Sequence, residues 1–299
     1  MRIAMTGASG LIGSAVTRVL RDDGHDVVAF TRSDPGPREA HWRPTGGQID
    51  RETLASCQAV IHLAGESIGS GRWTPERKRR IRDSRVEGTR LLANTMAELE
   101  DGPRVLLSAS AVGYYGDRGA QELTEESAAG DGFLARVCRD WEDATSQAED
   151  AGVRVVHVRT GVVLSPKGGA LQRQLPIHKL GLGAQLGSGE QYWPWVTLVD
   201  VAGLYRFLLT EEEARGPVNA TAPNPVTNVV FTRTLNRVLH RPTFPLAVPQ
   251  AALRLALSEL ADALLFFSQR VIPERAERLG YRWQHTELET GLRAVLDGA

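Results

Sequence analysis

The sequence predicts an α/β protein with a doubly wound parallel sheet and a smaller, mainly helical C-terminal region. Apolar runs of strand length alternate with amphipathic segments of helix length through the first half, a pattern typical of strands joined by crossover helices. These runs are apolar throughout, as expected of strands buried on both faces. A glycine-rich loop follows the first run and precedes an apolar-periodic helix, which indicates a strand-turn-helix unit.

Five strands are expected in the first 165 residues, at 3–6, 26–32, 59–65, 104–110 and 153–160. Thr74 as cap and Pro75 as first helical residue predict a helix that continues through Leu92. A second long helix is expected over 131–151, with Gly152 ending it before the next strand. We therefore assign 1–165 to one doubly wound domain.

Beyond Pro166 the chain is interrupted by Gly and Pro, and we interpret 166–299 as a substrate-side region that begins with loops around a site. A short helix at 199–210 and a strand at 217–222 are expected to rejoin the sheet, so that 197–222 completes it. The C-terminal segment 245–297 predicts a small helical domain, with helices that open at Pro249 and Pro273.

Composition is that of an ordinary globular protein. Lys and Arg number 35 against 36 Asp and Glu, and hydrophobic residues make up 42% of the 299 residues. This balance offers no overall positive field for nucleic acid, and the most apolar stretch, 251–267, is too short and too charged to span a membrane. Without a secretory signal, a cytoplasmic protein is expected. The two cysteines and the histidine spacing indicate no metal site.

The strongest motif is the glycine-rich loop at 7–13. Gly7, Gly10 and Gly13 would permit a tight turn, a close approach of backbone amides to a pyrophosphate, and close packing of helix on strand. The motif predicts a dinucleotide site that also includes Thr6, Leu11 and Ile12. Its spacing is G-x-x-G-x-x-G, and the alternative is a turn that binds nothing.

Arg32, at the end of the second strand, favours NADP. A carboxylate at this place would bond the ribose 2′-hydroxyl of NAD, whereas a guanidinium suits a 2′-phosphate. A solvated Arg32 is the alternative, and Asp34 lies close enough in the sequence to reverse the preference.

The glycine loop, Ala64-Gly65 after the third strand and Ser108-Ala-Ser110 after the fourth resemble the extended short-chain dehydrogenases/reductases. Further motifs resemble an atypical branch of this group, the nucleoside-diphosphate-sugar epimerase-like proteins with a small C-terminal domain of unknown function. These motifs are His62-Leu-Ala-Gly-Glu66, Asp83-Ser-Arg85, 108–116, Trp141-Glu142 and 269–274. The resemblance implies an NADP-binding Rossmann fold and no known substrate. Cofactor-binding candidates after the later strands are Leu63, Ala64, Gly65, Ser108 and Arg159.

The chain departs from the family at its catalytic motif. Typical members use Tyr-x-x-x-Lys, in which the phenol transfers a proton while the lysine lowers its pKa and holds the nicotinamide ribose. None of the 5 tyrosines has a lysine four residues later. Counting back from Glu142 places Leu134 and Cys138 at the two positions, and we interpret Cys138 as a small buried thiol.

The segment after the fourth strand still carries groups for catalysis, because ligands of open α/β sheets lie outside the carboxyl ends of the strands. Ser110 resembles the family serine that bonds the reacting oxygen, and Tyr114 or Tyr115 could supply a phenol as an acid. In the alternative interpretation the serines satisfy backbone groups and the tyrosines pack.

Two weaker patterns remain open. The basic run 72–82 lies on a predicted helix and indicates a solvated or dimer-facing surface rather than a nucleic-acid site, which leaves a homodimer open. The aromatic run 192–195 suits a flat ligand or a buried core.

Together these features predict an NADP(H)-dependent oxidoreductase or epimerase-like enzyme that acts on a small polar substrate, with a sugar nucleotide as one candidate. The main alternative is a catalytically reduced NADP-binding sensor or regulatory protein that has lost turnover with Tyr-x-x-x-Lys. An interaction module without nucleotide is a third possibility, and it would require Gly7, Gly10 and Gly13 to tolerate larger residues.

Overall fold

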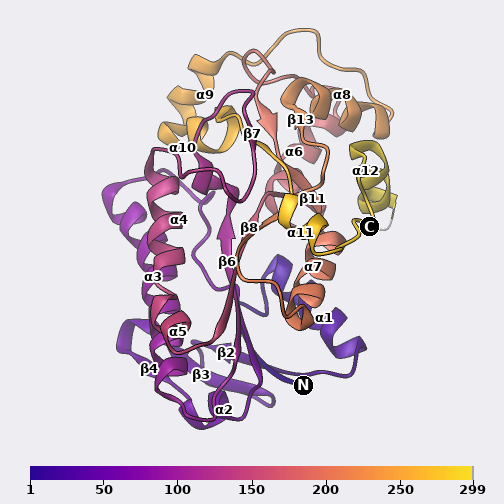
Figure 1. Cartoon of the computed structure of the whole chain (residues 1–299). Coiled ribbons are helices and arrows are strands. Elements are labelled where there is room, and N and C mark those ends of the chain that lie inside the picture. The colour runs from indigo at the N-terminus through magenta and orange to yellow at the C-terminus, as the bar shows by residue number, and fades with distance from the viewer. Residues whose placement is uncertain (298–299) are drawn as a thin grey trace.

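The computed structural model describes residues 1–297 and has an eight-stranded sheet at its centre (Figure 1). In spatial order the strands are β12 (Gly216–Ala220), β8 (Arg154–Thr160), β6 (Val105–Ala111), β5 (Ala59–His62), β1 (Arg2–Thr6), β2 (Asp26–Thr31), β3 (Glu39–Arg43) and β4 (Gln48–Ile49). Neighbours pair in parallel except β3 with β4. The strand order reverses between β1 and β5, so the predicted doubly wound sheet is confirmed.

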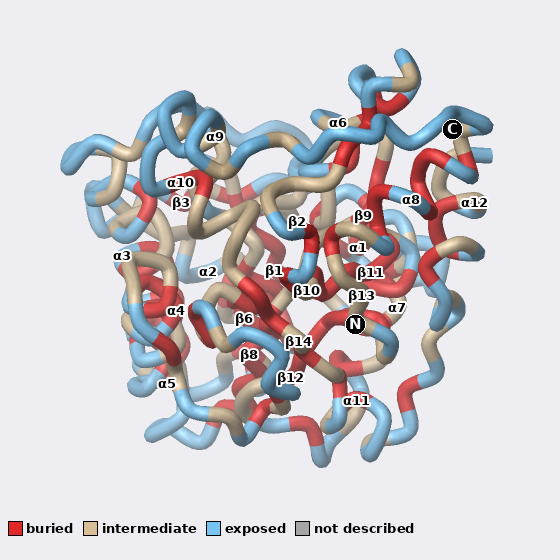
Figure 2. The backbone as a smooth tube through the Cα atoms, turned by 90° about the horizontal axis from the view of Figure 1, so that it is seen from above, coloured by how far each residue is buried: buried red, intermediate tan, exposed pale blue. Residues whose placement is uncertain are grey.

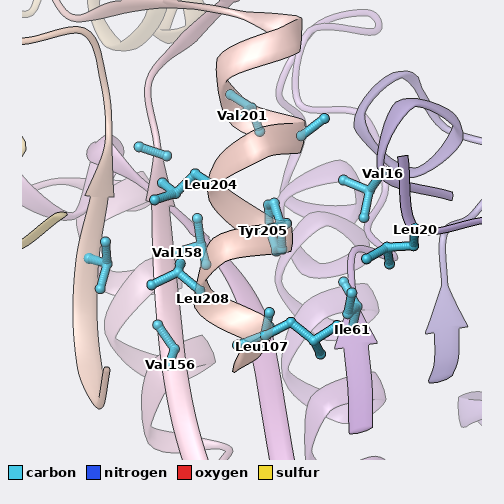
Figure 3. Close-up of a cluster of buried hydrophobic side chains, with 14 of the residues drawn as sticks. Val16, Leu20, Ile61, Leu107, Val156, Val158, Val201, Leu204, Tyr205 and Leu208 are labelled. Atoms are coloured by element: carbon cyan, nitrogen blue, oxygen red, sulfur yellow. The ribbon is translucent and has the colours of Figure 1, made fainter. Parts of the chain in front are cut away.

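Helices cover both faces of the sheet. One face carries α1 (Leu11–Asp22) and α7 (Leu198–Thr210); the other carries α2 (Arg51–Ala55), α3 (Pro75–Glu98), α4 (Phe133–Asp143) and α5 (Ser146–Asp150). Figure 3 shows Val16, Leu20 and Tyr205 of the two helices on the first face directed at Ile61 and Leu107 of the sheet. Because both faces are covered, the central strands β1, β5, β6 and β8 are buried at most positions.

The remaining elements lie around the rest of the sheet, with α6, α8 and α9 gathered at the upper end in Figure 1. The helices are α6 (Gly169–Lys179), α8 (Asn228–Val238), α9 (Gln250–Leu257), α10 (Glu259–Ala261), α11 (Glu274–Arg278) and α12 (Leu288–Asp297). The short strands are β7 (Glu122–Leu123), β9 (Val162–Leu164), β10 (Tyr192–Trp193), β11 (Trp195–Thr197), β13 (Val226–Thr227) and β14 (Arg270–Val271). Single turns are η1 (Pro44–Gly46), η2 (Val112–Tyr115) and η3 (Asp262–Phe266). Figure 2 shows buried backbone at the centre and exposed residues along α9 at the rim.

Several predicted elements are confirmed. All five expected strands are present, and the segment 197–222 rejoins the sheet through α7 and β12, which pairs with β8. Helix α3 begins at Pro75 as expected, with the hydroxyl of Thr74 accepting from the amide of Arg77 at 3.2 Å. The helical C-terminal region is also present.

Other predictions were wrong for reasons visible in the structure. The single helix expected over 131–151 is two helices, α4 and α5. Between them Thr145 donates to the Glu142 carbonyl at 2.7 Å and bonds buried His157 at 2.9 Å, and this side-chain competition interrupts the helix. The apolar helix expected to open at Pro249, by contrast, is present as α9 and ends at Ser258, whose φ is +55°.

The loops expected after Pro166 include a helix, α6. Gly168, Gly169 and Pro176 resemble loop residues, but the helix buries Leu171, Leu175 and His178 along one face. Strand β3 was not predicted at all, because it lies near the sheet edge and buries only two of its five residues. These elements depend on tertiary packing rather than on local pattern.

Asp200 ties α7 to the C-terminal segment. Its carboxylate is fully buried and accepts from the hydroxyl of Thr197 at 2.7 Å, the amide of Gln284 at 2.6 Å and the ring of His285 at 3.0 Å. Its backbone carbonyl accepts from the phenol of Tyr281 at 2.8 Å. One acidic side chain therefore joins a sheet-covering helix to residues 281–285.

We expect Asp200→Ala to lower the free energy of unfolding by about 3 kcal/mol or more, because several buried donors would lose their acceptor. Chemical denaturation at neutral pH measures this loss. Asp22→Ala, an exposed aspartate on α1, is the control and should stay within about 0.5 kcal/mol of the parent chain. Equal stability of Asp200→Ala and the control would contradict the role of Asp200.

A second polar pair lies where β1 and β5 end side by side. The hydroxyl of Thr6 and Nδ1 of His62 are 2.6 Å apart, and the imidazole packs edge-on against Trp42. Burial, with a smaller effect from the charge of Arg85, lowers the pKa of His62 to about 3.

Below about pH 6.5 the unfolded chain therefore binds a proton at His62 that the folded chain does not bind. The stability due to neutral His62 is complete above that pH and is lost as the pH falls towards 3. From about pH 6 to about pH 4, the parent chain should lose roughly 2 kcal/mol more unfolding free energy than His62→Asn, whose amide can still bond Thr6. Identical pH profiles of the two chains would exclude this contribution.

Candidate functional site

The glycine-rich loop turns tightly between β1 and α1. Gly7 has a φ of +68°, and a Cβ at this residue would lie 2.8 Å from the carbonyl carbon of Leu63. A Cβ on Gly13 would lie 2.1 Å from the carbonyl oxygen of Gly7. Gly10 precedes α1 and provides no side-chain cap, so the first amides of the helix, at Leu11 and Ile12, are suited to an anion.

Thr6 joins this loop to the loop after β5. Its hydroxyl accepts from the amides of Leu63 at 3.2 Å and Ala64 at 3.3 Å. Thr6 is almost fully buried, so it positions the backbone of both loops. The structure thus brings together the predicted residues Thr6, Gly7, Leu63 and Ala64, and Gly65 follows them directly.

Arg32 is exposed just beyond the end of β2, as expected. A second guanidinium lies beside it: Nε of Arg43, from β3, donates to the carbonyl of Arg32 at 3.0 Å. Arg43 also pairs with Asp34 at 3.6 Å, so the carboxylate that could have reversed the cofactor preference has a cationic partner. Arg32 therefore has a second guanidinium beside it, which faces Asp34. Sequence reasoning missed Arg43 because it missed β3.

Ser108 and Ser110 lie on β6, but their surroundings differ. Ser108 is fully buried, and its hydroxyl lies 3.5 Å from the carbonyl oxygen of Ala109. Ser110, near the carboxyl end of the strand, donates to Oε1 of Glu142 at 2.6 Å. Glu142 lies on α4 and was recognised in the sequence only as a family marker. A hydroxyl bonded directly to a carboxylate can pass a proton to it.

Arg159, from β8, holds the other side of Glu142. Its Nε and Nη2 donate to the two carboxylate oxygens at 2.9 Å and 2.8 Å, a bidentate pair with the guanidinium 3% exposed. Burial disfavours the charge of Arg159, but hydrogen bonds to Glu142 and Tyr115 outweigh burial and raise the pKa of the guanidinium. Arg159 thus fixes the orientation of Glu142 behind Ser110.

The two tyrosines after β6 have different roles. The phenol of Tyr115 is buried, donates to Asn219 at 2.7 Å and accepts from Arg159 at 3.1 Å. Burial raises the pKa of Tyr115 to about 12, against the opposing effect of Arg159. Tyr114 is partly exposed, and its ring lies 3.5 Å from Cζ of Arg159. Of these two phenols, Tyr114 is therefore the one without a hydrogen bond to residues 1–297.

The positions of the missing Tyr-x-x-x-Lys motif lie on α4. Leu134 packs against Gly113, and Cys138 is buried with its thiol 3.6 Å from the carbonyl of Ala111. Burial raises the pKa of Cys138 to about 12, so the thiol is uncharged and unreactive at neutral pH. Cys138 is the small buried thiol that the sequence predicted.

Arg85, from α3, also reaches this edge of the sheet. Its guanidinium packs over Gly65, where a Cβ would lie 3.2 Å from Cζ, and over the ring of Trp141 on α4 at 5.1 Å. The sequence offered one signal, the motif Asp83-Ser-Arg85, but could not show which way the side chain points.

The two weaker sequence patterns have structural explanations. Trp193 and Trp195 are buried in a core with Phe231, so the aromatic run fills the interior. In the basic run, Arg77 pairs with Glu66 and Lys78 pairs with Glu259. Within residues 1–297 no cluster of three or more potential metal ligands occurs. In the same part of the chain, no helix combines the length and the apolar character needed to cross a membrane.

The chain matches two family models. The model of the NAD dependent epimerase/dehydratase family matches residues 3–220, and that of a domain of unknown function (DUF1731) matches residues 248–295.

Individual proteins agree with these matches. An epimerase family protein of Mycobacterium bovis is 44% identical over 291 residues, covering 97% of this chain and 96% of the relative. The human epimerase family protein SDR39U1 is 33% identical over 299 residues, covering 99% and 100%. A crystal structure of the human protein with NADPH has a TM-score of 0.90 at 32% identity and covers both chains completely.

These matches confirm the resemblance drawn from the sequence motifs, including that to proteins with the small C-terminal domain. The chain belongs to the NAD dependent epimerase/dehydratase family.

Proposed function

We propose that this protein is an NADP(H)-dependent oxidoreductase or epimerase-like enzyme that acts on a small polar substrate, with sugar nucleotides as one candidate class. The observation that carries the proposal is the hydrogen bond from Ser110 to the partly buried carboxylate of Glu142, at the carboxyl edge of the sheet. The human relative crystallised with NADPH, similar over its whole length, supports the choice of cofactor.

The residues at the sheet edge fit NADP(H). Gly7 and Gly13 leave room where a Cβ would collide, and the uncapped N-terminus of α1 suits the pyrophosphate. Arg32 and neighbouring Arg43 suit the 2′-phosphate on the β2 side of the strand-order reversal. The nicotinamide would then lie on the β5 and β6 side, near Ser110. When bound, this cofactor supplies hydride transfer.

The chain's own residues supply proton transfer. As the proton of a substrate hydroxyl passes to Oγ of Ser110, the proton of Ser110 passes to Oε1 of Glu142. Reversal of the two transfers returns the proton to a substrate oxygen. Arg159 holds the carboxylate in place by two hydrogen bonds throughout. Tyr114, on the same loop, is the second candidate acid.

A specific observation favours the alternative of an NADP-binding sensor or regulatory protein. Leu134 and Cys138 at the motif positions have neither a phenol nor an ammonium; both lie beside Gly113, and Cys138 is buried. Such a protein would bind the cofactor without turnover.

We also propose the domain division. Residues 1–165 form one domain, whose sheet is completed by 197–222, and 166–299 form the second region, with its helical part at 245–297. The cytoplasmic location and a homodimer are proposals as well.

Fluorescence titration of the full chain with NADPH and with NADH tests the cofactor. We expect tighter binding of NADPH, and we expect Arg32→Ala to weaken NADPH binding roughly tenfold or more because a charge-assisted contact to the 2′-phosphate is lost. NADH, which lacks that phosphate, should bind equally well to both chains. Arg90→Ala, which removes an exposed arginine of α3, is the charge-matched control. Absence of binding to either nucleotide would defeat the cofactor proposal.

Ser110→Ala separates an enzyme from a sensor. In one set of reactions the parent chain is incubated with NADPH and a panel of aldehydes and ketones, in a second with NADP⁺ and a panel of alcohols and sugar nucleotides, and the consumption or formation of NADPH is followed. We expect Ser110→Ala to lower the turnover found by roughly 100-fold or more, because the proton path through the hydroxyl is lost. The dissociation constant for NADPH should stay within about twofold.

Ser56→Ala is the control for this experiment, since Ser56 ends α2 and its hydroxyl bonds only the local carbonyl of Thr53 and the side chain of Arg2. Turnover that survives in Ser110→Ala would remove Ser110 from the mechanism. NADPH binding by the parent chain without turnover on any member of either panel would favour the sensor.

A further inference from the structure

Arg85 reaches the carboxyl edge of the sheet from the middle of α3. Its Nη1 donates to the backbone carbonyls of Glu66 at 3.0 Å and Ile81 at 2.9 Å. These bonds fix the guanidinium against Gly65, in the loop that directly follows β5. The side chain is therefore held in one orientation at the place where the loop after β5 passes the candidate site.

The positive charge of Arg85 has no carboxylate partner within salt-bridge distance among residues 1–297. Glu66 is the carboxylate that acts on Arg85 electrostatically, but it is bound by Arg77 and also lies 3.5 Å from Arg80. Burial accordingly lowers the pKa of the Arg85 guanidinium. Arg159, deeper in the same region, has a bidentate carboxylate instead. A largely enclosed charge that keeps unused donors is suited to bind oxygen atoms of a ligand.

The place of Arg85 indicates which part of a dinucleotide it would meet. The strand order reverses between β1 and β5, and a dinucleotide lies across such a reversal. Arg32 is on the β2 side, so the adenosine half belongs there. Gly65 follows β5 on the other side, so a group over Gly65 faces the nicotinamide half.

The same position lies beside Cys138 of α4, the motif position at which typical family members have a lysine. Arg85 packs on Trp141 and acts electrostatically on Cys138, one turn earlier on the same helix face. The guanidinium of α3 thus places a positive charge at the part of α4 where the chain has a thiol.

We propose that Arg85 is a cofactor-binding residue that holds the nicotinamide-side ribose and phosphate of NADP(H) through its unused guanidinium donors. The inference rests on the proposed function, because it requires that the glycine-rich loop at 7–13 binds NADP(H). Arg85 would thus contact the nicotinamide-side half of the cofactor, which Arg32 and the glycine-rich loop do not hold.

Two ligands test the assignment: NADPH, and adenosine 2′,5′-bisphosphate, which lacks the nicotinamide-side half. Binding of both to the full chain is measured by calorimetry for the parent, Arg85→Gln and Arg85→Lys. We expect Arg85→Gln to bind NADPH roughly tenfold more weakly and the bisphosphate within about twofold of the parent. Arg85→Lys keeps the charge without the planar fork and should be intermediate for NADPH. Arg90→Gln, exposed on the same helix, is the matched control.

Unchanged NADPH affinity in Arg85→Gln overturns the inference. An equal loss of affinity for both ligands also overturns it, because Arg85 would then act on the whole dinucleotide site. If thermal unfolding shows that Arg85→Gln does not fold, Arg85→Lys decides, and parental affinity for NADPH in that variant overturns the inference. A parent chain that binds neither ligand removes the proposed function and this inference with it. A parent chain that binds both, beside an unchanged Arg85→Gln, removes this inference alone.

Discussion

The candidate site depends on a close contact between two backbones. The loop after β1 and the loop after β5 touch at Gly7, where any side chain would collide with Leu63, and the buried hydroxyl of Thr6 joins the two loops by accepting two amides. Because β1 and β5 are the strands at which the sheet order reverses, this contact sets the edge over which α1, the loop to α3 and the end of β6 converge. A larger residue at position 7 would separate these elements.

Two arginines near that edge show how charge compensation distinguishes a structural group from a ligand-facing one. Arg159 meets both oxygens of Glu142, so its charge is satisfied within the protein and it holds that carboxylate behind Ser110. Arg85 donates to backbone carbonyls and packs on Trp141, which fix its orientation but leave its charge without a paired carboxylate. Burial of an unpaired charge costs free energy. An anionic ligand bound at Arg85 would lower that cost, as Glu142 does for Arg159.

The sequence predicted the features that local pattern determines. The strands β1, β5, β6 and β8 are buried on both faces and are therefore rich in apolar residues. Gly10 and Gly13 are required by close contacts with Gly7 and Ala8 inside the loop 7–13 itself. Contacts between distant segments could not be predicted. Ser110 and Glu142 are 32 positions apart, and only the packing of α4 on β6 brings them together. The interruption at Thr145 likewise depends on His157 in a later strand.

The hydrogen bond between Ser110 and Glu142 also has a direction, and under the proposed function that direction selects the substrate group. An ionised carboxylate paired with a guanidinium can only accept hydrogen bonds. The hydroxyl of Ser110 is therefore the donor in its bond with Glu142. The hydroxyl oxygen of Ser110 then has lone pairs to offer and no proton left. It can accept from a substrate hydroxyl but cannot donate to a carbonyl. In this protonation state the pair is arranged to remove a proton from an alcohol, and the reduction of a carbonyl requires that Glu142 first gain one.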